Sequence, residues 1–135
     1  LGYGVQACYR GPRLFDSEET KALVKKWVSF YKQHRDVLDQ GDIIHLRRPN
    51  GRDWDGILHV NPSGTEKGLA CLYKPLTESI TREIRLPLHY TGLRKTARVS
   101  IDGAEPKAVH LSDNHDAVLT VKIPAQGRSF LLFTE

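Results

Sequence analysis

The stretch GDIIHLRRPNGRDWDGILHVNP, residues 41–62, marks the point where the hydrophobic pattern of the chain changes its period. Before Gly41, apolar residues recur at spacings of three and four, which is typical of an amphipathic helix. From Ile43 onward they alternate with polar residues or form short apolar runs, which is typical of β-strands. The change of period therefore predicts one helix followed by an all-β region.

The helix is predicted to span about residues 17–39. Asp16 or Ser17 can accept hydrogen bonds from its first amide groups, and Gly41 is placed to end it. Its apolar face is too broad for a helix that stands alone in water, so we expect it to pack on another surface. This face contains Leu23, Val24, Trp27, Val28, Tyr31 and Leu38.

Eight short segments after Gly41 are predicted to be strands. Turn-forming Gly, Pro, Asn and Asp residues separate them, and no helical pattern lies between them. This spacing predicts a mainly β fold, an antiparallel β-sandwich of seven or eight strands preceded by one long amphipathic helix. We divide the chain into residues 1–40 and a β domain, residues 41–135. The segments are residues 43–48, 54–60, 68–73, 80–88, 97–101, 109–111, 117–123 and 129–133.

The opening stretch itself is predicted to form a hairpin that closes through residues 49–51. In this hypothesis Leu46 lies opposite Trp54, and Arg47 lies opposite Asp53, so that unlike charges pair across the strands. The same register places Ile44 opposite Gly56 and His45 opposite Asp55, with Ile44, Leu46, Trp54, Leu58 and Val60 on one apolar face.

Three chemistries compete with a purely structural hairpin. Asp53 and Asp55 share a face and could act as acid and base in glycoside cleavage, but such a pair needs a pocket. His45, Asp55 and His59 could bind a metal, although their spacing matches no compact motif. Trp54 could stack on a sugar ring, as amphipathic aromatic side chains do. We favour a structural hairpin, in which a salt-bridged surface covers a Trp that belongs to the core. We predict no catalytic, cofactor-binding or metal-binding residue.

Composition narrows the classes of partner. The net charge of +4 comes from basic residues interleaved with acids, which disfavours nucleic acid. No apolar run approaches the ~20 residues of a membrane span. Cys8 and Cys71 are interpreted as free thiols, with a single disulfide as the alternative. The segment SDNHD, residues 112–116, is predicted to be a polar turn that could hold Ca²⁺ only weakly.

Several segments of the chain resemble the C-terminal part of α-galactosidase-like glycoside hydrolases. They are WVSFYKQHRDVL (27–38), the opening stretch, GLACLYKP (68–75) and IRLPLHYTGL (84–93), so the resemblance covers nearly the whole chain. These enzymes have a (β/α)8 catalytic barrel followed by an antiparallel sandwich. One departure is Tyr73-Lys74-Pro75, where the family often carries a sequence like Tyr-Asn-Pro.

The resemblance implies a division of the chain between these two parts. Residues 1–13 would be the last barrel strand and its loop, residues 17–39 the last barrel helix, and residues 41–135 the sandwich. Catalytic carboxylates lie on earlier barrel strands, so no catalytic residue can be transferred to this chain. The chain contains no Met and opens at Leu1, which also predicts a piece of a longer polypeptide.

The resulting prediction is a non-catalytic domain of a periplasmic or secreted glycoside hydrolase, which packs on the catalytic barrel and stabilises it. One alternative is a carbohydrate-binding module, for which Tyr90, Phe130 and Phe133 are further aromatic candidates. The other is a protein-interaction sandwich, with dimerisation through the exposed face of the helix. The residues predicted to contact a sugar or a neighbouring domain are Trp27, Tyr31, Trp54 and Tyr73.

Overall fold

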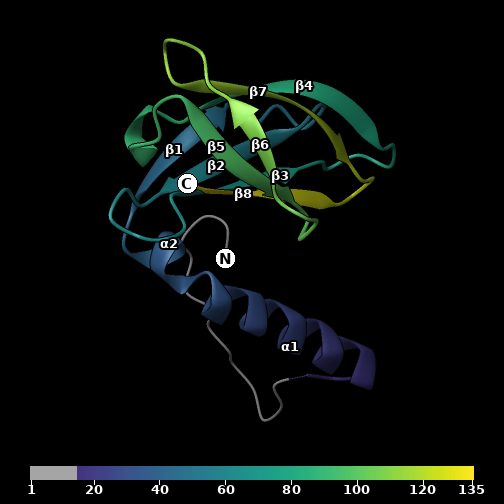
Figure 1. Ribbon diagram of the computed structural model, residues 1–135. Coiled ribbons are helices and arrows are strands. Elements are labelled where there is room, and N and C mark those ends of the chain that lie inside the picture. Colours follow the sequence, from purple (N-terminus) through teal and green to yellow (C-terminus); the bar gives the residue numbers. More distant parts are fainter. Residues whose placement is uncertain (1–14) are drawn as a thin grey trace.

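A computed structural model describes residues 15–135 and confirms a mainly β chain with one long helix (Figure 1). Each predicted strand is present, with its ends within two residues of the predicted ones. The helices are α1 (Glu18–Gln33) and α2 (Arg35–Asp39), and η1 (His89–Thr91) is a short 3₁₀ turn. The strands are β1 (Asp42–Arg47), β2 (Asp55–Val60), β3 (Gly68–Tyr73), β4 (Ile80–Pro87), β5 (Thr96–Ile101), β6 (Lys107–His110), β7 (Asp116–Ile123) and β8 (Arg128–Thr134).

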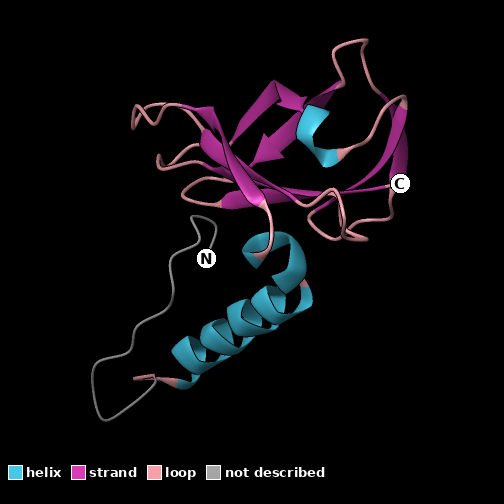
Figure 2. Cartoon of the chain, turned by 90° about the vertical axis from the view of Figure 1, so that its left-hand side faces the viewer, coloured by secondary structure: helices cyan, strands magenta, loops and turns pink. Residues whose placement is uncertain are grey.

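The strands form two antiparallel sheets that stack as two layers. The larger sheet has the order β1-β2-β3-β8-β5-β6, and the smaller one pairs β4 with β7. In Figures 1 and 2 the small sheet covers one face of the large sheet, and α1 lies on the other side of it. The large sheet is therefore the central layer, with different neighbours on its two faces.

The main core fills the space between the two sheets. Alternation along β2, β3 and β8 sends every second side chain into it, as the period of two requires. The small sheet contributes Ile84 and Leu86 from β4 and Val121 from β7. The fully buried members from the large sheet are Leu58, Val60, Ala70, Leu72, Leu131 and Phe133.

A second, smaller core lies on the outer face of the large sheet. Ile57, Leu69 and Cys71 point to this side, and Val37 and Leu38 of α2 cover them. β2 and β3 are therefore buried on both faces. Their near-continuous apolar runs, GILHV and LACLY, are typical of strands covered on two sides.

The long helix is interrupted once, at His34, where the backbone leaves helical geometry between α1 and α2. The buried imidazole of His34 lies 2.8 Å, through Nδ1, from Oε1 of Glu66 in the loop between β2 and β3. Phe30, one turn earlier, packs edge to face against Phe130 of β8. These contacts fix the direction in which α1 leaves the sheet.

The predicted register of the first hairpin is wrong by two residues up to His45, and by three at Arg47, which lies opposite Gly56 and not Asp53. Ile44 lies opposite Leu58, not Gly56, and His45 lies opposite Ile57, not Asp55. Two features lengthen the turn. One is a bulge between His45 and Arg47. The other is the Asn50 side chain, whose Oδ1 accepts hydrogen bonds from the backbone amides of Arg52 and Asp53. A shift of two keeps every side chain on its face, so the predicted apolar face is confirmed.

None of the described helices is long and apolar enough to cross a bilayer.

Strand β7 offers a matched test of the sandwich, because Val121 is 1% exposed in the core and Val118 is 54% exposed on the same strand. Val121→Ala should lower the free energy of unfolding by about 2 kcal/mol, since it removes buried methyl groups and leaves a cavity. Val118→Ala should change it by less than about 0.5 kcal/mol. Urea denaturation followed by circular dichroism measures both. Equal effects in the two variants would contradict the two-layer packing.

Candidate binding pocket between the helix and the sheet

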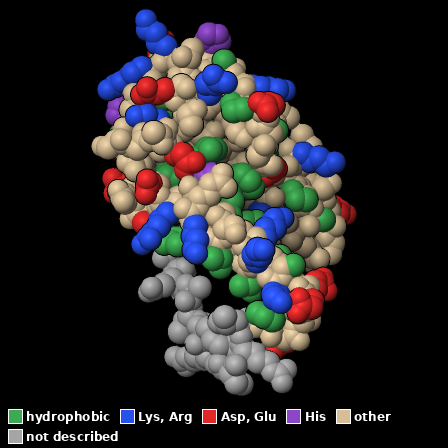
Figure 3. All heavy atoms as spheres, turned by 60° about the horizontal axis from the view of Figure 1, so that its bottom comes forward, with side chains coloured by type: hydrophobic (Ala, Val, Ile, Leu, Met, Phe, Trp, Pro, Cys, Tyr) green, Lys and Arg blue, Asp and Glu red, His purple; other side chains and the backbone are tan. Residues whose placement is uncertain are grey.

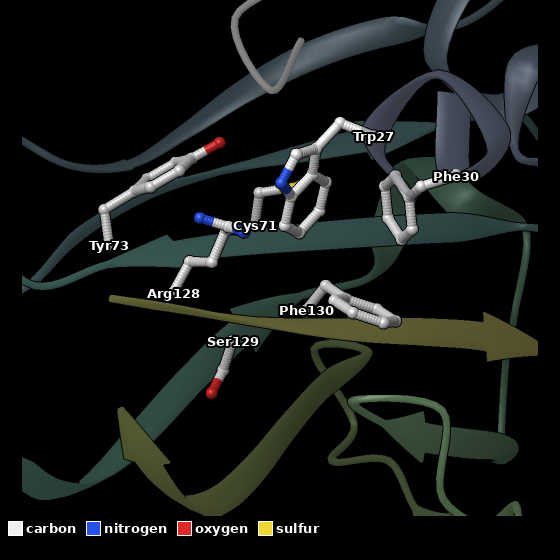
Figure 4. A pocket seen from close by; sticks show the side chains of 7 residues that line it. All are labelled: Trp27, Phe30, Cys71, Tyr73, Arg128, Ser129 and Phe130. Carbon is white, nitrogen blue, oxygen red and sulfur yellow. The ribbon is translucent and has the colours of Figure 1, made fainter. Parts of the chain in front are cut away.

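A pocket of about 320 Å³ lies between α1 and the outer face of the large sheet (Figure 4). We call it the Trp27 pocket. Its walls are mainly aromatic, with one cationic side chain, one thiol and one hydroxyl. The residues that line it are Trp27, Phe30, Cys71, Tyr73, Arg128, Ser129 and Phe130.

The register of β3 and β8 brings the floor of this pocket together. Tyr73 lies directly opposite Arg128, and Cys71 lies directly opposite Phe130. All four side chains share the outer face of the sheet because their positions differ by two along each strand. Trp27 then reaches the floor from α1, about two turns before His34 ends that helix.

Arg128 stacks on the indole ring of Trp27, with Cζ 3.4 Å from the ring centroid. Such a cation–π contact contributes about 0.5–2 kcal/mol and uses the face of the planar guanidinium. Partial burial lowers the pKa of Arg128 from its ordinary value. Lys26 also lies 5.3 Å from the Trp27 ring, so cations flank the aromatic side chain that the sequence proposed for sugar stacking.

The thiol of Cys71 does not act as a nucleophile at neutral pH. Burial raises its pKa to about 11, so the side chain stays protonated and behaves as a small apolar group. Cys71 is a free thiol, as predicted, whereas Cys8 lies outside the described residues.

Of the four predicted contact residues, the structure brings two together. Trp27 and Tyr73 both line the pocket. Tyr31 is directed elsewhere, because its hydroxyl donates to Asp39 Oδ2 at 2.5 Å, which raises the pKa of the tyrosine. Trp54 packs against the main core with Arg47 5.6 Å from its ring centroid, which agrees with the interpretation as a core Trp.

The acid–base interpretation of the opening stretch does not fit the geometry. Nη1 of Arg47 donates to Oδ2 of Asp53 at 2.6 Å, and Nε of Arg82 lies 3.5 Å from Oδ1. The hydrogen bond from Arg47 lowers the pKa of Asp53, so this carboxyl is ionised and cannot act as a general acid near neutral pH. The predicted ion pair of Arg47 with Asp53 is present, but the predicted register is wrong here, since Arg47 lies opposite Gly56.

The metal interpretation fails for a different reason. His45 and His59 lie on the outer face, but they are not paired across the strands, since His45 lies opposite Ile57 and His59 opposite Ile43. Within residues 15–135, no group of three His, Cys, Asp or Glu side chains is arranged to hold a metal ion. The 112–116 segment is a polar turn closed by backbone hydrogen bonds, and Arg85 holds the carboxylate of Asp116 at 2.7 Å.

Arg128 is a charged pocket residue that the sequence reasoning missed. It follows Gly127 in a turn and looks like an ordinary surface cation. The available signal was its spacing of two before Phe130, which places both on one face of a strand. Its contact with Trp27, 101 positions earlier, depends on tertiary structure.

No family model matches this chain, and no curated protein is significantly similar to it in sequence. The α-galactosidase-like resemblance therefore stays a prediction.

The Arg47–Asp53 pair predicts a specific dependence on pH. A lowered pKa means that folding stabilises ionised Asp53, so this contribution is present above the unfolded value of about 3.9 and is lost as pH falls through the lower folded value. Arg47→Gln should raise the pKa of Asp53 in a carboxyl ¹³C NMR titration. Arg48→Gln, at the exposed neighbouring position, should leave it unchanged. An Asp53 titration that is the same in both variants would refute the assignment.

Proposed function

We propose that this chain is a non-catalytic β-sandwich region of a secreted or periplasmic glycoside hydrolase, and that it packs on the catalytic barrel through α1. The observation that carries the proposal is the exposure of α1, which has sixteen residues and buries none of them. The side chains of Leu23, Val24 and Val28 are 53%, 39% and 44% exposed, and we call them the exposed row.

The exposed row has the properties of an uncovered contact surface. Its members follow the spacing of one and four along one side of a helix. A helix of this kind normally gains most of its stability by packing its apolar side on another element. Seen from the helix side, hydrophobic side chains lie among Lys, Arg, Asp and Glu (Figure 3). The enzyme class comes from the sequence resemblance, and the position of this row supports the expected contact between barrel and sandwich.

Aromatic geometry favours this proposal over a carbohydrate-binding module. Sugar-binding sites use an aromatic face that is open to stacking. Trp27 already stacks on Arg128, and Trp54 is part of the core packing. Tyr90 is 65% exposed, but the ring of His89 stands perpendicular to it at 5.3 Å. A flat platform of several aromatic rings is therefore not formed by these three candidates.

In the absence of the barrel, the exposed row should drive association between copies of the chain. Sedimentation velocity should show a concentration-dependent dimer, and Val28→Asp should abolish it, because a charge in an apolar contact is costly. Lys25→Gln is the matched control, since it changes the net charge by the same amount on the polar side of α1. Equal loss of association in the two variants would argue against the row.

Two measurements test whether the chain belongs to a glycoside hydrolase: an activity assay and the coding sequence upstream of Leu1. The purified chain should release no chromophore from nitrophenyl glycosides, whereas the full-length gene product should. The coding sequence upstream of Leu1 should specify alternating strands and helices with Asp or Glu at strand ends. Robust turnover by this chain, or an upstream sequence without that alternation, would refute the proposal.

A further inference from the structure

We propose that the Trp27 pocket binds a small aromatic carboxylic acid, with the ring of the acid against the aromatic walls and its carboxylate on the edge of the Arg128 guanidinium. This inference concerns the contact of Trp27 with the sheet and does not depend on the proposed function, which concerns the exposed row.

The size and lining of the pocket suit a ligand with one ring. Its volume of about 320 Å³ is at the lower end of the range for ligand sites, roughly 300–1,000 Å³. Phe30 and Phe130 meet edge to face at 4.8 Å and close one side. The buried, protonated thiol of Cys71 adds an apolar floor. Apolar walls with one convergent charged group are typical of small-molecule sites.

Arg128 has the geometry of a carboxylate receptor. Its contact with Trp27 uses the face of the guanidinium and leaves the N–H groups, which lie in the plane, directed along its edge. Such an edge matches the two oxygens of a carboxylate. In Figure 4 the Arg128 side chain extends between those of Tyr73 and Trp27, which also line the pocket.

Within residues 15–135, no carboxylate forms an ion pair with Arg128. Four other arginines differ in this respect, since Arg35, Arg47, Arg82 and Arg85 each lie within 4.0 Å of an Asp oxygen.

Arg128 also lines a second pocket, and the acidic residue of that pocket is Asp102. The carboxylate of Asp102 already accepts hydrogen bonds from Ser129 Oγ at 2.9 Å and from the Phe130 amide at 2.9 Å. Lys26 lies on the same side of α1 and adds a second positive charge near Trp27. The local charge therefore favours an anion, and the guanidinium edge is the group placed to receive it.

The test uses 3-phenylpropanoate and its neutral amide, 3-phenylpropanamide, as a matched pair of probes. The chain has two Trp residues, so its ¹⁵N spectrum has two indole N–H resonances, and the one missing in Trp27→Phe reports the pocket. The acid should shift that resonance saturably with a Kd in roughly the millimolar range, as expected for a ligand of this size. The Trp54 resonance should not move.

The charge requirement decides between this site and a non-specific apolar contact. The amide should bind at least about tenfold more weakly, because it cannot form the charge-assisted pair. Arg128→Gln should weaken acid binding to a similar degree, and Arg98→Gln, at an exposed arginine on β5, should not. An unchanged Trp54 resonance in Arg128→Gln shows that the fold is intact. Equal binding of acid and amide, unchanged binding by Arg128→Gln, or no saturable shift at tens of millimolar acid would overturn the proposal.

Discussion

The outer face of β2, β3 and β8 is apolar, and the rest of the arrangement follows from the need to cover it. Ile57, Leu69 and Cys71 lie there in rows set by the strand period, and burying each large apolar side chain contributes about 1.5–3 kcal/mol. Val37 and Leu38 cover part of this face from a helix of only five residues. Since α2 is anchored there, α1 leaves the sheet at His34 and contacts β8 through Trp27 and Phe30. The Trp27 pocket is the space left between that helix and the sheet.

The sequence pattern was sufficient to predict the strands, but it was insufficient to predict how they pair and where the helix breaks. The dyad alternation in β5 and β7 and the turn residues between segments predicted every strand, because both signals are local. The register of the first hairpin was wrong because Asn50 caps the turn and a bulge follows His45, and neither feature changes the hydrophobic pattern. The break at His34 was also invisible, since the apolar stripe continues through Val37 and Leu38.

The candidate site shows the same limit more sharply. Trp27 and Tyr73 could be chosen from the sequence because exposed aromatic residues are frequent in contact sites. Their proximity could not be predicted from the sequence, because it depends on the pairing of Tyr73 with Arg128 and on the contact of α1 with β8. Asp53 and Asp55 attracted attention for their spacing, yet the ion pair with Arg47 makes Asp53 a structural anion. In each case the residue type suggested a possible chemistry, and the charge of the neighbouring side chain determined the role that the residue has in the structure.

The two ends of α1 are stabilised in different ways, and this difference bears on function. At its C-terminal end, tertiary contacts of Trp27, Phe30 and His34 hold the helix to the sheet. At its N-terminal end the described contacts are local. The Ser17 cap is worth about 1 kcal/mol, and the exposed Glu18–Lys21 pair about 0.2–0.5 kcal/mol. Isolated helices of about 12–15 residues are marginal in water, so a surface that covers Leu23, Val24 and Val28 would stabilise this end as it binds. Docking and the ordering of this half of α1 are therefore expected to be coupled.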